Sequence, residues 1–597
     1  MTYDTIIRNG RWFDGTGAPS AIRNIGIAGG RVTAVTPHAL DETGCPQVID
    51  ASGKWVLPGM VDVHTHYDVE VLGGPGLPES VRHGVTTVLV GSCSLSTVHV
   101  GGADAGDLFG RVEAIPREHV IAAVDQSKTW NNAAEYIAAL ESRPLGPNIA
   151  SFLGHSDMRT ATMGLDRATR KDVQPTAAEQ AQMERMLDDA LDAGFLGMSS
   201  QQLLFDKIDG DTCRSRTLPS TYAKPRELRR LKSLLRRRGR VLQSGPDIKN
   251  PFNIVSQVAQ SLPVLRNTLK TSLLSAADVK SNPVAIAALG PLARLVNRFG
   301  ADFRWQHLPV PFEVYADGID LVVFEEFGSG AAALHLRDSV ERDALLQDEE
   351  YRRWFRKDYD NRFGMRVWHR DFFDAEIVEC PDESVIGKSF GQVGFDRGGL
   401  HPVDAFLDLV VEHGPKVRWK TTISNHRPEV LKKLARDSGI QMGFSDAGAH
   451  LRNMAFYNFG LRLLRHVRDA QRAGAEFMTI EQAVHRLTGE LADWYGIDAG
   501  HLRIGDRADI IVLDPDRLDG SLDEYAEAPV TQYANLPRMV NRNDATVNLV
   551  LIGGRAVVRD GVPTELLGAE RTGSFLRAGQ RTAVPQSASE KELSHAG

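Results

Sequence analysis

The sequence has few cysteines and no long hydrophobic run. Only four cysteines occur in 597 residues, and no two of them form a Cys-x-x-Cys pair. This spacing excludes a disulfide-rich secreted framework and favours a reducing compartment. No uninterrupted apolar stretch approaches about 18 residues, so no transmembrane helix is expected. Asp4 and Arg8 interrupt the apolar core that an N-terminal signal peptide would need. We therefore expect a cytoplasmic protein with no membrane partner.

A strong excess of charge of one sign is also missing. The 69 Lys and Arg residues against 77 Asp and Glu residues give a formal net charge of −8. This balance offers no electrostatic case for nucleic-acid binding. A hydrophobic share of 42% and a charged share of 24% are typical of a soluble globular protein. Disordered, collagen-like and coiled-coil chains are thereby excluded.

One segment is strongly basic despite this balance. Residues 226–240 read RELRRLKSLLRRRGR, with leucines at 228, 231 and 235. That spacing predicts a helix that packs its leucines on a larger core and turns its charges to water. A nucleic-acid patch is the alternative, and the acidic total charge favours the solvated helix face.

Both ends of the chain carry short strand patterns. The first 58 residues contain β-rich runs separated by Asn-Gly, Gly-Gly and Ser-Gly turn signals, and residues 502–514 and 547–563 have the same pattern. We predict a small β-sandwich domain assembled from residues 1–58 and 500–570. The polar segment 575–597 is predicted to be a mobile tail.

The middle of the chain, residues 59–499, alternates apolar runs with amphipathic helical segments. The runs lie at 56–63, 85–90, 149–153, 195–198, 240–242, 271–274, 417–422 and 440–444. Eight buried runs alternating with helices predict an α/β fold, a parallel (β/α)8 TIM-like barrel. An open doubly wound sheet is the alternative, but no Gly-x-Gly-x-x-Gly follows any run. Because residues 281–415 are too long for one connection, we predict an insertion between strands six and seven.

The first of these runs ends in two histidines, His64 and His66. Alternation along a strand points residues i and i+2 to the same side, so both imidazoles would project from the C-terminal mouth of the barrel, where barrel enzymes place their sites. Two histidines on one face make half of a first-row metal site, typically zinc. A polar strand edge is the alternative.

The last run leads into GFSDAGAH at 443–450, which contains Asp446. In a closed barrel the last strand neighbours the first, so this carboxylate can contact the metal and take a proton from water. An Asp that caps the following helix is the alternative.

Together these motifs resemble the amidohydrolase superfamily. The order of LPGxxDxHTH, barrel, terminal Asp and GxLRIGDRADIIVLD covers nearly the whole chain. HGVTTVLVGSCSLS (83–96), GHSDMR (154–159) and GFLGMSS (194–200) resemble the N-acyl-D-amino-acid deacylase branch, which is D-aminoacylase-like. The resemblance implies a (β/α)8 barrel, zinc, and hydrolysis of an amide in a substrate similar to an N-acyl amino acid.

The resemblance also assigns roles to individual residues. His64, His66 and Cys93 match metal ligands, and Asp446 matches the catalytic carboxylate, which also reaches the metal. A small buried core residue is the alternative for Cys93. His155 matches a position after strand three, where it is either a catalytic donor at the mouth or a structural hydrogen-bonding residue.

The sequence departs from the family pattern on strands five and six, where the resemblance implies histidine ligands. Those positions hold Gln243-Ser244 and Ser275-Ala276, and Gln and Ser are poor zinc ligands. Asp247 and Asp278 lie nearby in sequence but away from the expected positions. We therefore predict one Zn²⁺ per chain rather than two. Other divalent metals remain open, because a site of nitrogen and oxygen ligands also accepts Mn, Fe or Ni.

A substrate carboxylate would need a cation near the barrel mouth. The candidates for substrate binding are Arg159, Lys280, Arg452 and His450, and a surface charge is the alternative for the first three. Two residues of the predicted insertion, Gln306 and Tyr315, are candidates for a lid, with core or surface positions as alternatives.

These observations predict a metal-dependent hydrolase that cleaves a non-peptide carbon–nitrogen bond, with Asp446 as general base and acid. An N-acyl-D-amino acid is the expected substrate. The missing histidines leave open a cyclic amide, carbamate or ester hydrolase, a carbon–carbon lyase, and a non-catalytic binding protein. We expect a small-molecule substrate with a carboxylate, no nucleic-acid partner, and a homo-oligomer.

Overall fold

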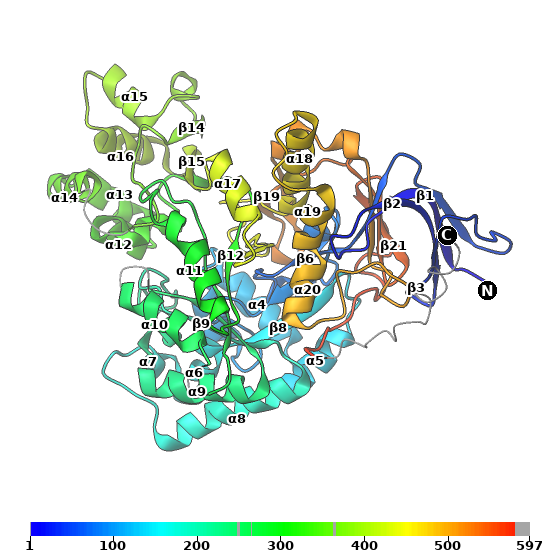
Figure 1. Ribbon diagram of the computed structural model, residues 1–597. Coiled ribbons are helices and arrows are strands. Elements are labelled where there is room, and N and C mark those ends of the chain that lie inside the picture. Colours follow the sequence, from blue (N-terminus) through cyan, green and yellow to red (C-terminus); the bar gives the residue numbers. More distant parts are fainter. Residues whose placement is uncertain (1, 248–250, 264–265, 362–365, 580–597) are drawn as a thin grey trace.

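An eight-stranded parallel barrel forms the centre of the protein (Figure 1). The computed structural model describes residues 2–247, 251–263, 266–361 and 366–579. The barrel strands are β6 (Met60–Asp62), β7 (Val85–Val90), β8 (Asn148–Gly154), β9 (Gly197–Gln201), β10 (Val241–Gly245), β11 (Lys270–Leu273), β12 (Phe303–His307) and β16 (Ile440–Met442). Segments just beyond β6 and β16 close the barrel, since the Val63 N–H donates to the Gly443 carbonyl at 2.8 Å. The predicted TIM-like α/β fold is confirmed.

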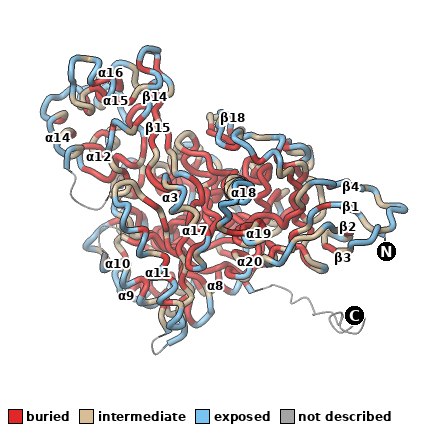
Figure 2. The backbone as a smooth tube through the Cα atoms, turned by 45° about the horizontal axis from the view of Figure 1, so that its top comes forward, coloured by how far each residue is buried: buried red, intermediate tan, exposed pale blue. Residues whose placement is uncertain are grey.

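Helices cover the outside of the barrel, and its strands are buried (Figure 2). Those that follow the middle and last strands are α8 (Ala177–Ala193), α9 (Pro225–Arg238), α10 (Pro251–Ser261), α11 (Ile286–Arg298), α18 (Phe459–Arg472), α19 (Ile480–Leu487) and α20 (Gly489–Tyr495). The longest, α8, begins at a capping box formed by Thr176 and Glu179 and ends at Gly194, whose φ of 108° favours glycine. These local signals explain why the amphipathic segment starts and stops there.

Shorter helices connect the early barrel strands. They are α1 (Glu70–Gly73), α2 (Pro78–Val81), α3 (Gly102–Gly110), α4 (Arg117–Ser127), α5 (Ala133–Glu141), α6 (His155–Met163) and α7 (Leu165–Ala168), and α17 (Pro428–Ala435) precedes the last strand. In the described part of the chain, none of the helices is both long and apolar enough to cross a membrane.

A second sheet, of nine strands, joins the two ends of the chain. Its strands are β1 (Thr5–Trp12), β2 (Ala21–Ala28), β3 (Arg31–Thr36), β4 (Gln47–Asp50), β5 (Trp55–Pro58), β17 (Ile510–Leu513), β20 (Val547–Ile552), β21 (Arg555–Arg559) and β22 (Val562–Pro563). The two halves meet where β5 pairs antiparallel with β17. The strand-rich ends thus lie side by side (Figure 1), while the predicted domain limits at 58, 500 and 570 stay a prediction.

The predicted tail begins later than expected. Phe575 is 3% exposed and bridges to Ile149 of the barrel, and Leu576 is 6% exposed. These apolar side chains anchor residues 575–579, and the remainder, 580–597, lies outside the described residues.

The position of the insertion differs from the prediction. The seventh barrel strand is β12, which pairs with both β11 and β16. The run at 417–422 instead belongs to β15 (Arg418–Ser424), the middle strand of a separate sheet with β13 (Phe312–Asp317) and β14 (Glu376–Glu379). The insertion therefore lies between strands seven and eight. Residues 303–307 and 417–422 both mix polar and apolar side chains. The hydrophobic pattern therefore could not distinguish the seventh barrel strand from a strand of the inserted sheet.

Aromatic side chains pack together inside the insertion, which forms a separate lobe (Figure 1). Phe406 stacks on Phe372 at 4.6 Å between ring centroids and packs edge-on against Trp419 at 6.0 Å. Its helices are α12 (Gly328–His335), α13 (Ser339–Gln347), α14 (Glu349–Asp360), α15 (Phe390–Asp396) and α16 (Pro402–His413). A two-stranded ribbon of β18 (Ala526–Val530) and β19 (Leu536–Val540) lies elsewhere in the chain.

Candidate metal centre

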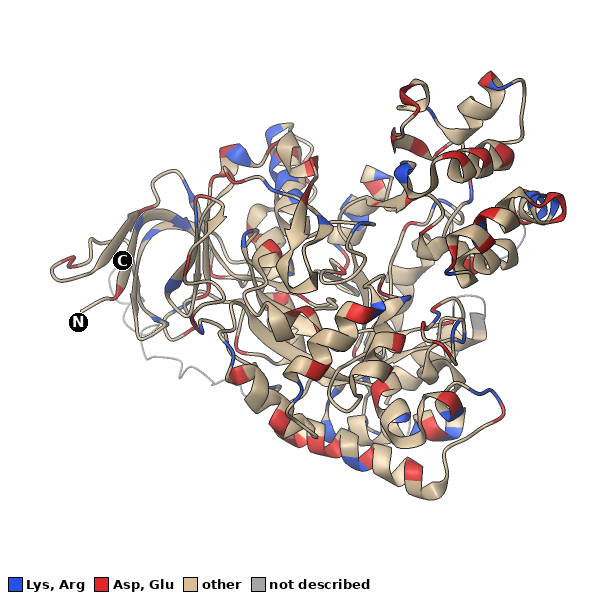
Figure 3. Ribbon diagram, turned by 180° about the vertical axis from the view of Figure 1, so that it is seen from behind, with Lys and Arg blue, Asp and Glu red and all other residues tan. Residues whose placement is uncertain are grey.

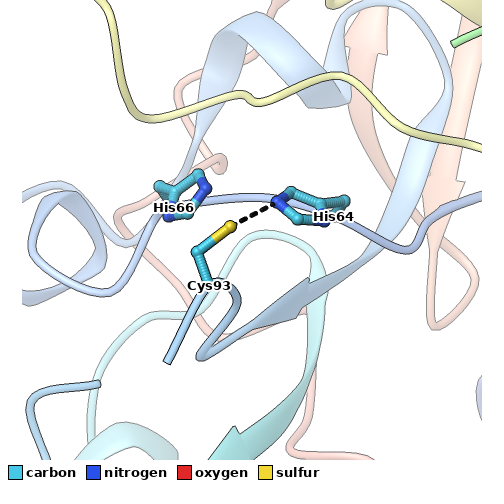
Figure 4. A group of neighbouring side chains, drawn as sticks. All are labelled: His64, His66 and Cys93. Carbon is cyan, nitrogen blue, oxygen red and sulfur yellow. Dashed lines mark hydrogen bonds between the residues drawn. The ribbon is translucent and has the colours of Figure 1, made fainter. Parts of the chain in front are cut away.

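His64 and His66 follow β6 at the C-terminal mouth of the barrel, where the sequence places them. The chain stays extended beyond the strand, because the His66 N–H donates to the Ala447 carbonyl at 2.8 Å. The two rings are 5.2 Å apart and almost fully buried. Figure 4 shows both rings facing the Cys93 thiol, and one ligand atom from each of the three residues lies within 4.8 Å of the others.

Cys93 reaches the histidines from the turn after β7. Its backbone φ of 51° and that of Ser94, 70°, lie in the left-handed region, so the chain turns sharply at this point. The Cys93 N–H donates to Gln243 Oε1 at 3.3 Å, which holds the turn, and the sulfur lies 3.3 Å from His64 Nε2. Burial raises the pKa of the Cys93 thiol to about 12. A cation is the group that would stabilise a thiolate here.

Asp446 completes the cluster from the loop after β16. Its Oδ1 lies 3.5 Å from His64 Nε2 and 3.3 Å from His66 Nε2. Burial opposes ionisation of this carboxyl, but the hydrogen bond from His66 and the nearby histidine charges hold its pKa at about 2. The Asp446 side chain is 14% exposed, against 0% for His64 and 2% for His66. Access to the centre is therefore from the side of Asp446.

The donor set fits a zinc-like cation. Thiolate, imidazole and carboxylate are the ligands that Zn²⁺ takes in proteins, and tetrahedral bonds of about 2.0–2.3 Å place neighbouring donors about 3.3–3.6 Å apart. Three donor separations are 3.3 Å to 3.5 Å: Cys93 Sγ to His64 Nε2, and Asp446 Oδ1 to Nε2 of His64 and of His66. His64, His66 and Cys93 form the group that could hold one cation, and the Asp446 carboxylate lies beside both histidines without being part of that group.

Two residues lie beside the far nitrogens of the histidine rings: Gln306, predicted as a candidate for a lid but buried on β12, and Glu113, which the sequence analysis did not name. Gln306 Oε1 lies at hydrogen-bond distance, 2.7 Å, from His64 Nδ1, whereas Glu113 Oε1 lies 3.4 Å from His66 Nδ1, which has no hydrogen-bond partner. Partners of this kind fix the tautomer so that Nε2 can bind metal. The missed signal for Gln306 was its place on strand seven. Glu113 lies between α3 and α4, and no motif marks it.

Strand five contributes an amide where the resemblance implied a histidine. Gln243 lies on β10, with its Nε2 3.2 Å from His64 Nδ1. After strand six, Ala276 is buried and its N–H donates to the Gln306 carbonyl at 2.8 Å. Neither Asp247 nor Asp278 joins the metal group found among the described residues, and the Asp278 carboxylate pairs with Arg427.

His155 and Arg159 do not join the metal centre. His155 Nδ1 lies 3.1 Å from Ser200 Oγ and its Nε2 lies 2.8 Å from Glu227 Oε1, so both ring nitrogens are engaged elsewhere. The Arg159 guanidinium is fully buried and pairs with the other oxygen of Glu227. Both residues thus contact Glu227 in a buried network, and the catalytic role of His155 and the substrate-binding role of Arg159 stay predictions.

The other predicted cations are also paired. Lys280 Nζ contacts Asp374 Oδ2 at 2.6 Å in a cavity of about 670 Å³ within the insertion. Arg452 lies between Asp317 at 3.1 Å and Glu527 at 3.0 Å.

The last two candidates are His450, which adjoins the metal centre, and Tyr315, which does not. His450 is the substrate-binding candidate that adjoins the centre, with Nε2 3.8 Å from Glu113 Oε2. Tyr315 is 5% exposed and donates to Glu313 at 2.7 Å, so it is a core residue of the inserted sheet rather than a lid.

Comparison with known proteins agrees with this geometry. A model of the amidohydrolase family matches residues 47–240. An uncharacterized protein of Mycobacterium tuberculosis (strain ATCC 25618 / H37Rv) is 57% identical over 97% of this chain and 96% of that protein. An N-acyl-D-glutamate deacylase of Alcaligenes xylosoxydans xylosoxydans is 36% identical over 33% of this chain and 37% of that enzyme. The solved N-acyl-D-glutamate deacylase from Bordetella bronchiseptica, complexed with zinc and a phosphonate inhibitor, has the same fold, with a TM-score of 0.61 at 22% identity over 97% of this chain and 100% of that one. Residues 47–240 therefore form an amidohydrolase family domain, and the chain over nearly its whole length is related to the mycobacterial protein.

Proposed function

We propose that this hydrolase removes the acyl group from an N-acyl-D-amino acid in a metal-dependent reaction. The observation that carries the proposal is the buried group of His64, His66 and Cys93, whose donors suit zinc, with Asp446 Oδ1 within 3.5 Å of both histidines. The similarity to deacylases, one of them a zinc complex, supports the reaction class. One Zn²⁺ per chain is the expected cofactor, because Gln243 occupies the position of a further ligand.

A cation held by this donor set would supply Lewis-acid polarisation of the amide carbonyl and would acidify the attacking water. The Asp446 carboxylate, ionised and on the accessible side, takes the proton from that water as the water oxygen bonds to the carbonyl carbon. It then delivers the proton to the amide nitrogen as the carbon–nitrogen bond breaks. The second proton of the water leaves the new carboxylic acid for the amine, so the products are a carboxylate and an ammonium group, and Asp446 ends ionised as it began.

The burial of the histidines keeps water away from every side of the cluster except that of Asp446. Burial also lowers the pKa of His450 to about 4, so its ring is neutral near pH 7 and can accept or donate a hydrogen bond. His450 is therefore a hydrogen-bonding contact for the substrate rather than the counter-charge of its carboxylate. The cation for that carboxylate, the oligomeric state and the cellular compartment stay predictions.

Metal content and turnover together test the proposal. Elemental analysis of the wild type should give about one divalent metal per chain, and Cys93→Ala should retain less of it. N-acetyl-D-amino acids should be turned over by the wild type and by the control Asp189→Asn, which changes an exposed residue of α8. Asp446→Asn should lose about 10²–10⁴-fold in kcat, the usual contribution of general acid–base catalysis. Full activity without Asp446 would exclude the mechanism.

A second reaction class is favoured by one observation, the Gln243 amide beside His64. Gln243 replaces the histidine ligand that the resemblance implies and so changes the polarity of the site. The alternative is therefore hydrolysis of a cyclic amide, carbamate or ester, or a lyase reaction. A metal-loaded protein that is inactive on both D and L N-acyl amino acids but opens a cyclic amide would favour this class. A protein that binds no metal would favour a non-catalytic role.

A further inference from the structure

Helix α9 carries the basic segment of the sequence, and its two faces differ. The outer arginines are neutralised by the acidic residues of α8: Arg230 binds Glu184 at 2.9 Å, and Arg238 binds Asp188 at 2.9 Å. Figure 3 shows acidic and basic residues close together along these lower helices. This face is the solvated one that the sequence predicts, and its charges are already balanced.

The inner face of α9 differs from the prediction that the helix turns all its charges to water. Lys232 is 5% exposed and Arg236 is 6% exposed, so two cations of α9 point into the protein with the leucines. Their contacts are neutral: Lys232 Nζ donates to Gln260 Oε1 at 2.9 Å, and Arg236 Nη2 donates to the Gln260 carbonyl at 2.6 Å. Arg236 Nε is buried without any hydrogen-bond partner. Buried cations are normally paired with an anion.

A third cation, Arg266, further disfavours the protonated forms of Lys232 and Arg236. Burial, followed by the charges of Arg236 and Arg266, lowers the pKa of Lys232 to about 8. Burial and Arg266 lower the pKa of Arg236 to about 10. Neither shift includes a contribution from a carboxylate. Three like charges gathered in this way would be stabilised by an anion placed between them.

A cavity of about 480 Å³ lies against these cations. Its lining includes four cations, at Arg229, Lys232, Arg236 and Arg266, and one carboxylate, at Asp247. Amide side chains, among them Gln257 and Gln260 of α10, provide neutral hydrogen-bonding groups. The volume is too large for a simple inorganic ion alone and falls in the usual range for small-molecule ligands, about 300–1,000 Å³.

The cavity is lined mainly by residues of α9 and α10. Gln202 and Asp247, at one part of its wall, come shortly after the C-terminal ends of β9 and β10, whereas Arg236 is in the last turn of α9 and Arg266 precedes β11. The residues of the metal centre are not part of the lining, so the cavity is a separate site.

We propose that this cavity binds a small molecule through an anionic oxygen group, a phosphate or a carboxylate, held by Lys232, Arg236 and Arg266. Arginine forks and a lysine ammonium are the side chains that bind such groups most strongly. The rest of the ligand would contact the amides and the apolar wall, which includes Leu204 and Leu228. The inference does not depend on the reaction proposed for the metal centre.

Calorimetric titration of the full-length protein with inorganic phosphate and, separately, with succinate tests the site and distinguishes the two chemistries. The wild type should bind at least one probe with a Kd of about 1 mM or tighter. Arg266→Ala and Lys232→Met should each weaken binding at least about tenfold, since each removes a charged hydrogen bond. The control is Arg237→Ala on the exposed side of the same helix, which should bind within about twofold of the wild type.

Three outcomes would overturn the proposal. They are no heat of binding with either probe up to about 20 mM, equal binding by Arg266→Ala and the wild type, and binding that is lost in His66→Ala but kept in Arg266→Ala. The last would show that the probe binds at the metal centre. Because Arg266 is exposed, its variant should fold even if Lys232→Met does not, and melting temperatures will show this.

Discussion

Gln306 Oε1 accepts a hydrogen bond from His64 Nδ1 at 2.7 Å, so strand seven of the barrel controls a ring that strand one presents. Its amide Nε2 in turn donates to Ser272 Oγ at 3.0 Å, which fixes which end of the amide faces the histidine. With the proton held on Nδ1, the His64 Nε2 lone pair faces Cys93 and Asp446. A neutral amide thus takes the part that a carboxylate plays behind many metal-binding histidines.

Removing this amide should weaken metal binding. In Gln306→Leu we expect the affinity for Zn²⁺ to fall about 10–100-fold, the usual loss when an outer partner of a ligand is removed. Competition with a chromophoric chelator measures it without any substrate. Gln441→Leu is the matched control, because Gln441 is equally buried and contacts Ser272 but not His64. Equal losses in the two variants would mean that barrel polarity, and not the His64 contact, sets the affinity.

Glu113 is the corresponding neighbour of His66. Its carboxyl group lies 3.4 Å from His66 Nδ1, is 2% exposed, and has its pKa raised to about 8 by burial. Glu113→Ala removes the oxygen nearest to Nδ1, so Zn²⁺ affinity should fall about 10–100-fold, while Glu113→Gln keeps an oxygen there and should lose less. The buried acid Glu490, which pairs with Arg486, supplies the control Glu490→Gln for general destabilisation. A Glu113→Ala protein with wild-type affinity would contradict this role.

Much of the fold and three of the four residues at the metal centre could be predicted because they depend on local patterns and on the barrel topology. The alternation of apolar runs predicted the barrel, and the i, i+2 spacing placed His64 and His66 on one side. Asp446 followed from the adjacency of the first and last strands in any closed barrel. Each of these inferences needs only the residues of one strand and the topology.

The parts that could not be predicted depend on side chains meeting across the sequence. Glu113 lies 47 residues after His66 in the sequence, and no rule of residue spacing predicts that the two side chains meet. Gln306 was assigned to an insertion because β12 carries Arg304 and Gln306 among apolar residues and so lacks the uniform apolar run of a buried strand. The polar residues of β12 lie in the barrel interior and at the C-terminal end of the strand, where functional sites of barrels replace apolar residues with polar ones.

His155, Arg159 and Glu227 should prove structural. Burial disfavours ionisation of Glu227, but hydrogen bonds and charges from the other two residues hold its pKa below the usual value. Glu227→Gln would leave the Arg159 guanidinium buried beside a neutral amide, so the free energy of unfolding should fall by about 3–5 kcal/mol. Chemical denaturation measures it.

The same variants separate the structural role from a catalytic one. His155→Gln should reduce stability yet keep the wild-type metal content and a kcat within about tenfold, because no proton at the metal centre depends on it. A kcat loss of more than about 10²-fold in a folded, metal-loaded His155→Gln protein would restore the catalytic role that the motif suggests.

His83 should make stability fall in mild acid. It is 2% exposed, its Nε2 has no hydrogen-bond partner, and burial lowers its pKa to about 4. In the unfolded chain a histidine takes up a proton near pH 6.5. Between pH 6.5 and pH 4 the unfolded state therefore binds the proton and the folded state does not, so unfolding becomes more favourable as the pH falls. The difference of about 2.5 pH units corresponds to at most about 3 kcal/mol.

Melting temperatures of the wild type and of His83→Asn between pH 4.5 and 8 measure this contribution. The wild-type melting temperature should drop more steeply below pH 6.5 than that of the variant, whose amide does not titrate. The exposed histidine His38 provides the control, and His38→Asn should follow the wild-type curve. Parallel curves for His83→Asn and the wild type would mean that the buried ring is not neutral in the folded protein. Only a ring that stays neutral on folding makes the unfolded state bind more protons in acid and so lowers the free energy of unfolding.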